Sequence, residues 1–272
     1  TDTSGATATD SFTIVVSNAN DAPTVSSTAI TTATEDAVYT YTLTGADADV
    51  GDTLTMSGTT VPSWLTFTAS TGVLTGTPTN DNVGTTGNEV VLTITDAAGE
   101  SVTDSFTITV ANTNDAPSFS SSPVLTAQED DVYTYTAVGT DMDAGDTFTL
   151  ASSSIPGWLT FTASSGVLTG TPTNSDVGSH SVTLTVTDAA GATGTQTFTI
   201  TVSNANDAPT VTSTAVTSAT EDSVYTYTLT ASDADVGDTL TMTGTTVPSW
   251  LTFTASTGVL TGTPTNDEVG DH

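Results

Sequence analysis

Residues 62–78 read PSWLTFTASTGVLTGTP, and near-copies of this stretch recur at 156–172 and 248–264. The motif Asn-Asp-Ala-Pro also occurs three times, always in the same order relative to this stretch. Self-similarity at a fixed period is the sequence signature of a tandem repeat. A period of roughly 90 residues is enough for one β-sandwich domain per repeat.

The Asn-Asp-Ala-Pro motifs divide the chain into four parts. Residues 20–113 and 114–205 are predicted to be complete repeats, residues 206–272 an incomplete repeat, and residues 1–19 the C-terminal strand of a preceding repeat. The first and third repeats are nearly identical and the middle one differs, which indicates an alternating array in a longer protein. We expect the natural chain to continue past His272; the alternative is completion by the N-terminal strand of a neighbouring copy.

Each repeat is predicted to be all-β. Apolar and polar residues alternate in Val38–Leu43, Thr53–Met56, Val90–Thr95 and Phe106–Val110, as they do in half-buried strands. Gly-, Asp-, Asn- and Pro-rich segments separate these runs, and no helical periodicity of useful length occurs. The expected fold is an Ig-like Greek-key β-sandwich repeated in a linear array, with the tryptophan of each Pro-x-Trp-Leu-Thr-Phe motif in the core.

The charge of the chain excludes several classes of partner. Its 272 residues include 31 acidic side chains and no Lys or Arg, which gives a formal net charge of −31. Nucleic acids are bound largely through Lys and Arg on phosphates, so no nucleic-acid partner is expected. Anionic membrane surfaces are disfavoured for the same reason, and no apolar stretch is long enough for direct membrane insertion.

The acidic residues recur at fixed places in the repeats. Each repeat has an early Glu-Asp pair and then Asp-x-Asp-x-Gly-Asp, and each complete repeat has a late Thr-Asp-Ala-Ala-Gly. Clustered carboxylates repel one another unless a positive charge lies between them, and the chain has no Lys or Arg to supply it. Ca²⁺ takes six to eight oxygen ligands from such groups, so calcium is the expected ion. The alternative is that these Asp and Asn residues only form turns.

The pattern resembles cadherin-like repeats, specifically the dystroglycan-type cadherin and putative-Ig modules of large bacterial surface adhesins. The stretch 62–78 resembles the putative-Ig signature, and the boundary at 112–117 resembles the cadherin interdomain linker. Asp141-x-Asp143 and the Asp188-Ala-Ala-Gly segment are similar to the cadherin Asp-x-Asp and Asp-x-x-Gly elements. The Leu-Asp-Arg-Glu element of cadherins is absent, and Asn80-Asp81 and Asn174-Ser-Asp stand near its place.

The resemblance implies calcium bound between consecutive repeats, with ligands carried over position by position. For the first boundary the implied ligands are Asn18, Asn20, Asp21, Asp47, Asp49 and Asp96. For the second boundary they are Glu35, Asn112, Asn114, Asp115, Asp141, Asp143 and Asp188. For the third boundary they are Glu129, Asn204, Asn206, Asp207, Asp233 and Asp235.

No catalytic constellation is apparent, because carboxylate pairs that recur once per repeat at boundaries are untypical of an active site. The predicted function is therefore non-enzymatic: an extracellular, cell-surface repeat region of a bacterial adhesin, rigidified by calcium, that acts as a stalk in cell or biofilm adhesion. Its expected partners are calcium and further repeats of the same protein. Two alternatives stay open: a filament or matrix of neighbouring copies assembled by strand donation, and a glycan-binding module with exposed aromatic residues.

Overall fold

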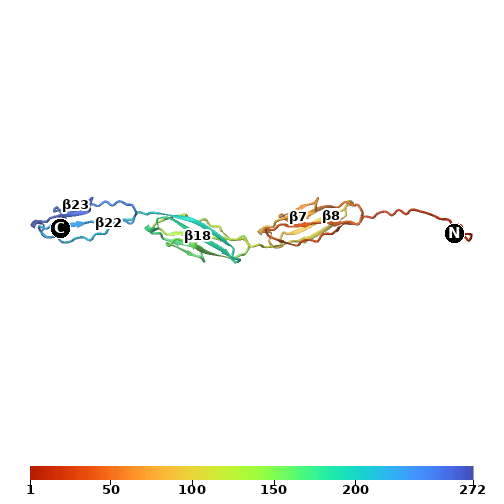
Figure 1. Cartoon of the computed structure of the whole chain (residues 1–272), viewed down its shortest axis with the longest axis horizontal. Coiled ribbons are helices and arrows are strands. Elements are labelled where there is room, and N and C mark those ends of the chain that lie inside the picture. Colours follow the sequence, from red (N-terminus) through yellow and green to blue (C-terminus); the bar gives the residue numbers. More distant parts are fainter. Residues whose placement is uncertain (272) are drawn as a thin grey trace. The chain divides into compact units, whose positions relative to one another are not determined.

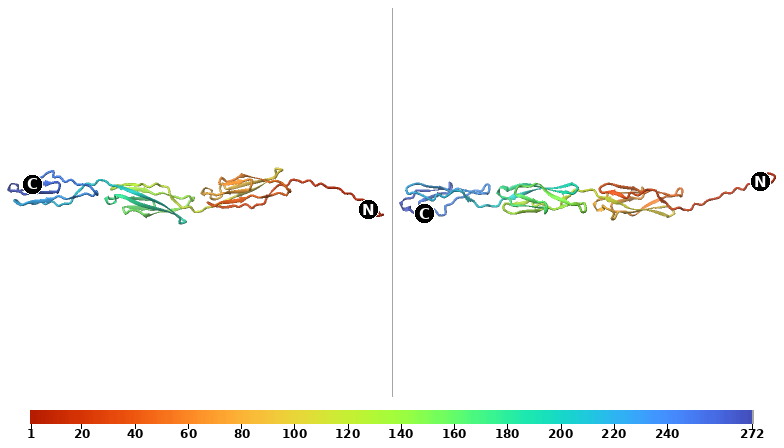
Figure 2. Two further views of the ribbon diagram at one scale, coloured as in Figure 1. Left: turned by 45° about the horizontal axis from the view of Figure 1, so that its top comes forward. Right: turned by 90° about the horizontal axis from the view of Figure 1, so that it is seen from below.

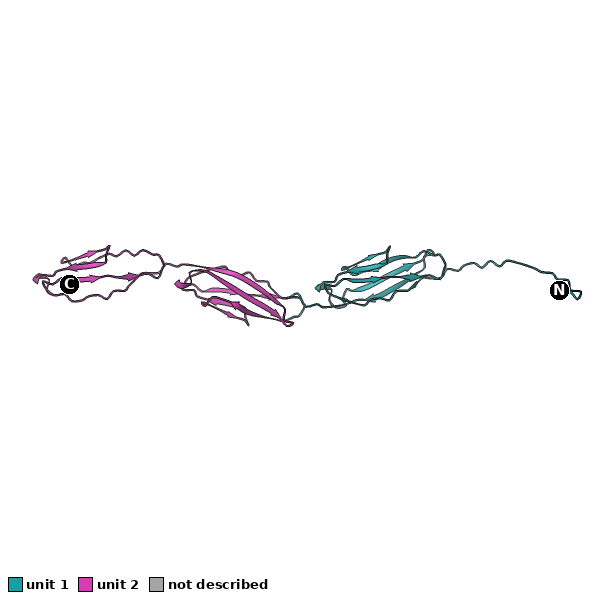
Figure 3. Ribbon diagram, viewed as in Figure 1, with its two compact units in different colours: residues 1–115, 141–146 teal, residues 116–140, 147–272 magenta. Residues whose placement is uncertain are grey.

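A computed structural model of the chain describes residues 1–271. The chain divides into two compact units, which are coloured separately in Figure 3. The first unit comprises residues 1–115 and 141–146, and the second comprises residues 116–140 and the chain from Thr147 onward. Each unit is described by itself.

The first unit contains the first repeat, which is built from short strands. Its elements are β1 (Thr24–Val25), β2 (Thr32–Thr34), β3 (Tyr39–Thr42), β4 (Gly45–Ala46), β5 (Thr55–Thr60), β6 (Leu65–Thr68), β7 (Val73–Gly76), the 3-10 turn η1 (Asn80–Asn82), β8 (Glu89–Thr95), β9 (Ser101–Thr107) and β10 (Thr109–Ala111).

These strands form two main antiparallel sheets, β3-β7-β6 and β5-β8-β9. The strands labelled β7 and β8 in Figure 1 belong to the two different sheets. Strand β10 does not continue the β5-β8-β9 sheet. It pairs in parallel with β2, with Val110 opposite Ala33. The last strand of the repeat is thereby joined to one of its earliest strands.

A buried apolar cluster lies between the sheets of the first repeat. Leu74, Leu92, Ile94 and Ile108 are fully buried, and Trp64 packs against them from the edge of the cluster. Alternation places these apolar residues on the inner faces and Thr or Ser on the outer faces, because successive side chains of a strand point to opposite sides.

The second unit contains the middle repeat and the residues of the third. The middle repeat consists of β11 (Ser118–Phe119), β12 (Thr126–Gln128), β13 (Tyr133–Thr136), β14 (Gly139–Thr140), β15 (Phe148–Ser154), β16 (Leu159–Thr162), β17 (Val167–Gly170), η2 (Asn174–Asp176), β18 (Gly178–Asp188) and β19 (Thr193–Ser203). The third repeat has β20 (Thr210–Val211), β21 (Tyr225–Thr228), β22 (Ala231–Ser232), β23 (Leu251–Thr254), β24 (Val259–Gly262) and η3 (Asn266–Glu268).

The middle repeat has the same architecture in a more continuous form. A four-stranded sheet, β12-β19-β18-β15, faces the three-stranded sheet β13-β17-β16, and β12 again pairs in parallel with β19. Figure 2 shows the strands of this repeat running nearly along its own long direction. Its core holds Val182, Leu184 and Ile200, with Trp158 packed against it.

The prediction of an all-β sandwich fold is confirmed, with strand bounds that differ in detail. The only helical segments among residues 1–271 are the three 3-10 turns, and none is long and apolar enough to cross a membrane. The run Phe106–Val110 was expected to be one strand, but it spans the end of β9 and most of β10. The prediction is wrong there because the ladder changes partner at Ile108, whose N–H donates to the carbonyl of Asn88.

The segment before Thr24 has no strand hydrogen bonds within the part of the chain described. Phe12, Val15 and Val16 are 78%, 84% and 86% exposed. That residues 1–19 form the last strand of a preceding repeat therefore stays a prediction.

Candidate metal centres

Six carboxylates are buried in the described structure: Glu35, Asp96, Glu129, Asp143, Asp188 and Asp235. Each is at most 8% exposed, and each belongs to the ligand sets expected from the sequence. Burial of a carboxylate is costly unless it is paired or binds a cation. The sequence supplies no Lys or Arg to pair with any of them.

The first centre combines the β4–β5 loop with the residue that follows β8. Carboxylate oxygens of Asp47, Asp52 and Asp96 lie within 4.8 Å of one another. The Asn20 amide donates to Asp96 Oδ2 at 2.9 Å, and this hydrogen bond lowers the pKa of Asp96. Asp47 Oδ2 is buried and has no hydrogen-bond partner.

Asp49 organises the chain that enters this centre. Its Oδ1 accepts a hydrogen bond from the Asn18 amide at 2.7 Å, and its Oδ2 accepts one from the backbone N–H of Asp21 at 2.8 Å. Its own N–H donates to Asp47 Oδ1 at 2.8 Å. The Asp-x-Asp motif thus fixes both its own loop and the preceding boundary segment.

The second centre, within the first unit, repeats the hydrogen bonds of the Asp-x-Asp motif but joins a different set of carboxylates. Carboxylate oxygens of Glu35, Asp115 and Asp143 lie within 4.8 Å of one another. Asp143 accepts hydrogen bonds from the Asn112 amide and from the backbone N–H of Asp115, both at 2.8 Å. Asp141 Oδ1 accepts the N–H of Asp143 at 2.9 Å, whereas Asp141 Oδ2 is buried without a partner.

The third centre lies in the second unit, where two groups of three carboxylates occur: Glu129, Asp130 and Asp207, and Asp233, Asp235 and Asp238. Asp235 accepts the Asn204 amide at 2.9 Å and the backbone N–H of Asp207 at 2.7 Å. The Asp207 N–H, followed by the Asn204 amide, lowers the pKa of Asp235. Desolvation raises the pKa of Glu129.

Two of the expected ligands make other contacts. The Asn114 and Asn206 amides each donate to the next residue's carbonyl, that of Asp115 or Asp207, at 2.9 Å. Asp188 ends β18, in the position that Asp96 holds after β8, and its Oδ1 accepts the N–H of Ala192 at 2.7 Å.

The sequence analysis missed residues that the structure brings into these groups. Asp52 and Asp130 contribute oxygens to the groups described above. Asn80 donates from its amide to Asp115 Oδ2, and Asn174 donates to Asp207 Oδ2 at 2.9 Å. Asp52 and Asp130 belong to the recurring Asp-x-Asp-x-Gly-Asp and Glu-Asp motifs, which were their signal; the signal for Asn80 and Asn174 was their place near the missing Leu-Asp-Arg-Glu element.

The donor sets fit a hard cation with many oxygen ligands. They consist of carboxylates, with asparagine side chains beside them and no thiol or imidazole among the residues named, which is a set typical of Ca²⁺ and not of Zn²⁺. The unpartnered oxygens of Asp47 and Asp141 are the second observation that points to an ion, because a buried carboxylate oxygen is normally hydrogen-bonded.

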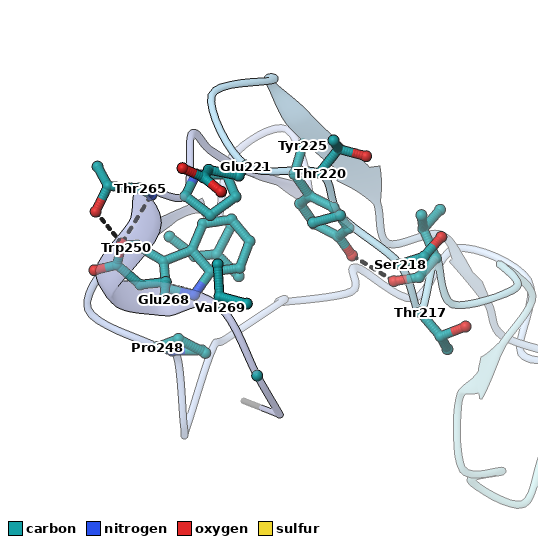
Figure 4. A pocket seen from close by; sticks show the side chains of 15 residues that line it. Thr217, Ser218, Thr220, Glu221, Tyr225, Pro248, Trp250, Thr265, Glu268 and Val269 are labelled. Carbon is teal, nitrogen blue, oxygen red and sulfur yellow. Dashed lines mark hydrogen bonds between the residues drawn. The ribbon is translucent and has the colours of Figure 1, made fainter.

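A pocket of about 450 Å³ opens in the third repeat (Figure 4). Tyr225, Trp250 and Leu251 line it together with residues 216–221. In the first repeat the corresponding strand β2 is covered by β10. The aromatic residues of the pocket are the counterparts of core residues in the other repeats: Tyr39 and Tyr133 lie in the buried clusters there, and Trp64 and Trp158 pack against them.

The chain is similar to a known adhesin. It is 32% identical over 155 residues to the serine-rich adhesin for platelets of Staphylococcus aureus, a match that covers 55% of this chain and 6% of the adhesin. The chain therefore spans only a small part of the length of the curated relatives it matches. A second such adhesin, from strain MRSA252, is also 32% identical and is covered over 10% of its length.

Solved cadherin structures share the fold. The extracellular cadherin domains 1–5 of protocadherin gamma B2 superpose with a TM-score of 0.55 and 16% identity, covering 89% of this chain and 53% of that one. Human CDH23 EC21-23 gives a TM-score of 0.52 and 16% identity, covering 87% and 88%. The sequence model described as "Putative Ig domain" matches residues 22–111, 116–203 and 208–272, and the chain belongs to this family, with its Ig domains in tandem.

Proposed function

We propose that this chain is an extracellular stalk region of a bacterial surface adhesin, and that Ca²⁺ bound at the repeat boundaries rigidifies it. The observation that carries the proposal is the set of buried carboxylates at the boundaries in a chain without Lys or Arg. The similarity to a staphylococcal adhesin supports the placement on a cell surface. The role is mechanical support and projection, with no reaction catalysed by this region.

Calcium would act by replacing the repulsion between carboxylates at each boundary with their attraction to a shared cation. In the second centre, Glu35 and Asp115 repel Asp143 across distances of less than 4.8 Å. A divalent cation held by these groups attracts all three and ties the end of one repeat to residues 141–146 of the next. Glu35, Asp115 and Asp143, with the unpartnered Asp141 Oδ2, would hold the ion; it supplies only electrostatic attraction and directional coordination.

The extracellular placement in this proposal agrees with the calcium affinity expected of such sites. Extracellular calcium modules bind with dissociation constants of ~10⁻⁴–10⁻³ M, so the sites would fill outside a cell and stay largely empty in a cytosol. At a calcium concentration about 100-fold above the dissociation constant, one site adds about 2.7 kcal/mol to the free energy of unfolding.

The test is small-angle scattering and calorimetry of the full chain in CaCl₂ and in chelator. We expect calcium to narrow the distribution of maximum dimensions and to raise the unfolding temperature. Identical scattering profiles and unfolding temperatures in the two buffers would exclude calcium as the stiffening agent. Mg²⁺ at the same ionic strength is the control, because screening of the carboxylates by added salt alone would also reduce repulsion.

A second candidate function, a filament of copies joined by strand donation, is favoured by one observation. Residues 12–16 expose their apolar side chains and pair with no strand among the described residues. Cysteine pairs placed between residue 14 and residue 219 test it. Cross-linked oligomers that form at low concentration would support the filament, and monomers alone would refute it.

A further inference from the structure

Strand β15 (Phe148–Ser154) forms one edge of the four-stranded sheet β12-β19-β18-β15 in the middle repeat. Its register with β18 shifts between Ser152 and Ser154, so the regular part of this edge is Phe148–Ser152. An edge strand presents unpaired backbone N–H and C=O groups, which are a template for another strand. Proteins usually protect such an edge with charged side chains or proline, and β15 contains neither.

The edge lies in an uncharged stretch of a very acidic chain. No Asp or Glu occurs between Asp146 and Asp176, although the chain has a formal net charge of −31. Copies with this charge repel one another wherever their acidic surfaces meet. The edge of β15 is therefore a place where two copies can approach without bringing carboxylates together.

A groove of about 510 Å³ lies beside β15. Val138, Phe148 and Leu150 line it, together with the turn at residues 163–166. Val138 is 49% exposed and Phe148 is 36% exposed, and the Phe148 ring lies against Gly139. A strand added to β15 would place alternate side chains over this groove, because successive side chains of a strand point to opposite faces. The groove thus offers apolar contacts in addition to the backbone hydrogen bonds of the edge.

We propose that β15 is a self-association edge: the β15 strands of two copies pair antiparallel about a two-fold axis that passes near Leu150. A two-fold contact uses the same patch on both copies, so one uncharged edge is sufficient. Leu150 is the midpoint of the regular segment, and this register places the Leu150 side chain of each copy beside the groove of the other. The contact would join stalks side by side. It goes beyond the proposed function and needs no bound calcium.

The charges at the ends of the edge select the antiparallel orientation. Asp146 lies two residues before β15, and Asp188 is opposite Phe148 on β18. In a parallel pair the Asp146 side chains of the two copies would be neighbours. In the antiparallel pair, each of these carboxylates lies about 20 Å or more from its counterpart, at 3.4 Å per residue and 4.8 Å per strand. This separation exceeds the screening length of about 8 Å at physiological ionic strength.

The first repeat provides a matched control. Its edge strand β5 is also free of charge, but Thr44 occupies the position of Val138 and makes the neighbouring surface more polar. Gly58 lies in β5 where β15 has Ser152, and a glycine weakens a strand. We therefore expect association through the edge of the middle repeat and not through that of the first.

The first experiment is a disulfide trap in the full chain, which contains no cysteine of its own. Chains carrying Thr149→Cys and chains carrying Ala151→Cys are mixed and oxidised, because these two exposed positions face each other across the proposed two-fold pair. Mass spectrometry separates mixed dimers from dimers of a single variant. We expect mixed dimers well above their statistical share. A mixture of Thr55→Cys and Ser57→Cys, the equivalent positions of the first repeat, should show no such excess.

The second experiment is sedimentation of the unmodified chain at increasing protein concentration. We expect weak dimerisation, because one strand pair is smaller than a standard protein interface. Dimerisation should strengthen as the salt concentration rises from about 0.01 M to about 1 M, since the screening length falls from about 30 Å to about 3 Å. At about 0.1 M salt, Ala151→Glu should weaken association about tenfold, because the added carboxylates of the two copies would lie about 8 Å apart. Ser57→Glu should have no such effect.

Three results would overturn the proposal. The chain stays monomeric at every salt and protein concentration, which would leave the edge to a strand of another protein. Mixed dimers form only in their statistical share, or dimers of a single variant exceed it, as a parallel pair would require. Ala151→Glu dimerises as well as the unmodified chain. Circular dichroism checks that the variants fold; if Ala151→Glu does not, the disulfide trap decides alone.

Discussion

The substitution Asp143→Asn removes one charge from the second centre while keeping the shape of the side chain. Without calcium, the variant should be as stable as the wild type or more stable. Asp143 is only 8% exposed and lies within 4.8 Å of Glu35 and Asp115, so each repulsion is worth up to about 4 kcal/mol at the effective dielectric of a partly buried pair. Relief of these repulsions opposes the loss of one of the two hydrogen bonds that Asp143 accepts, which costs about 1–3 kcal/mol.

The effect with calcium should be large, because the variant lacks a ligand. If wild-type binding at 100-fold excess contributes about 2.7 kcal/mol and the variant binds about 100-fold more weakly, its contribution falls to about 0.4 kcal/mol. The difference of about 2.3 kcal/mol corresponds to about 9–18 °C in the unfolding temperature of a domain of this size.

Differential scanning calorimetry of the full chain in CaCl₂ and in chelator measures both effects. Glu89→Gln is the matched control, since it makes the same charge change at an exposed position on β8 that belongs to none of the carboxylate groups described. We expect the control to keep the whole calcium-induced shift and Asp143→Asn to lose most of it in one transition. An equal shift in both variants would refute the reasoning that places Asp143 on the ion.

Burial raises the pKa of Tyr41 to about 12. The contribution of the neutral Tyr41 hydroxyl to the free energy of unfolding is therefore complete below the unfolded pKa of about 10 and is lost as the pH rises toward 12. Absorbance at 295 nm should show Tyr41 ionising only as the protein unfolds in alkali. In chelator, acid should act oppositely at two boundaries. The pKa of Asp96 is lowered, so the contribution of its carboxylate to the free energy of unfolding is lost as the pH falls below the ordinary aspartate range. The pKa of Glu129 is raised, so the free energy of unfolding increases as this group protonates. Carboxyl chemical shifts would report both pKa values, and shifts of the two pKa values in the same direction would contradict the assignment. Gly76→Ala would place a Cβ atom 2.0 Å from a neighbouring carbonyl oxygen and should cost about 1–3 kcal/mol in thermal denaturation, whereas Gly157→Ala, with open space around it, should not. Trypsin should leave the chain intact even in denaturant, because it contains no Lys or Arg, and any internal tryptic fragment would be inconsistent with this sequence.

Local alternation was sufficient to predict the strands that pair with their sequence neighbours. The run Val90–Thr95 was expected and corresponds to β8, because a strand buried on one face displays its period of two directly. The parallel pairing of β10 with β2 was not predictable in this way, since it joins residues more than 70 positions apart and depends on the tertiary fold.

The same distinction applies to the centres. Recurring carboxylates such as Glu35 and Asp143 were identified because acidic residues in a chain without bases are conspicuous. Asn80 was noted near the missing Leu-Asp-Arg-Glu element but left out of the expected ligands, because an asparagine in a Pro-Thr-Asn segment is an ordinary turn former. Only its hydrogen bond to Asp115, which lies 35 residues away, reveals a role in the boundary.

The parallel pairing of β2 with β10 determines how a repeat responds to force. Thr109, Val110 and Ala111 lie opposite Thr32, Ala33 and Thr34, and the chain leaves the repeat directly after Ala111. The chain enters the repeat at β1, which pairs with β4, so a pull on the two ends would load that pair before β2. Once the load reaches the ladder of β2 and β10, the two parallel strands would slide past each other in opposite directions, and their hydrogen bonds would be sheared together instead of opening one after another. A tether made of such repeats would yield abruptly, one repeat at a time, and would hold its length until each ladder failed.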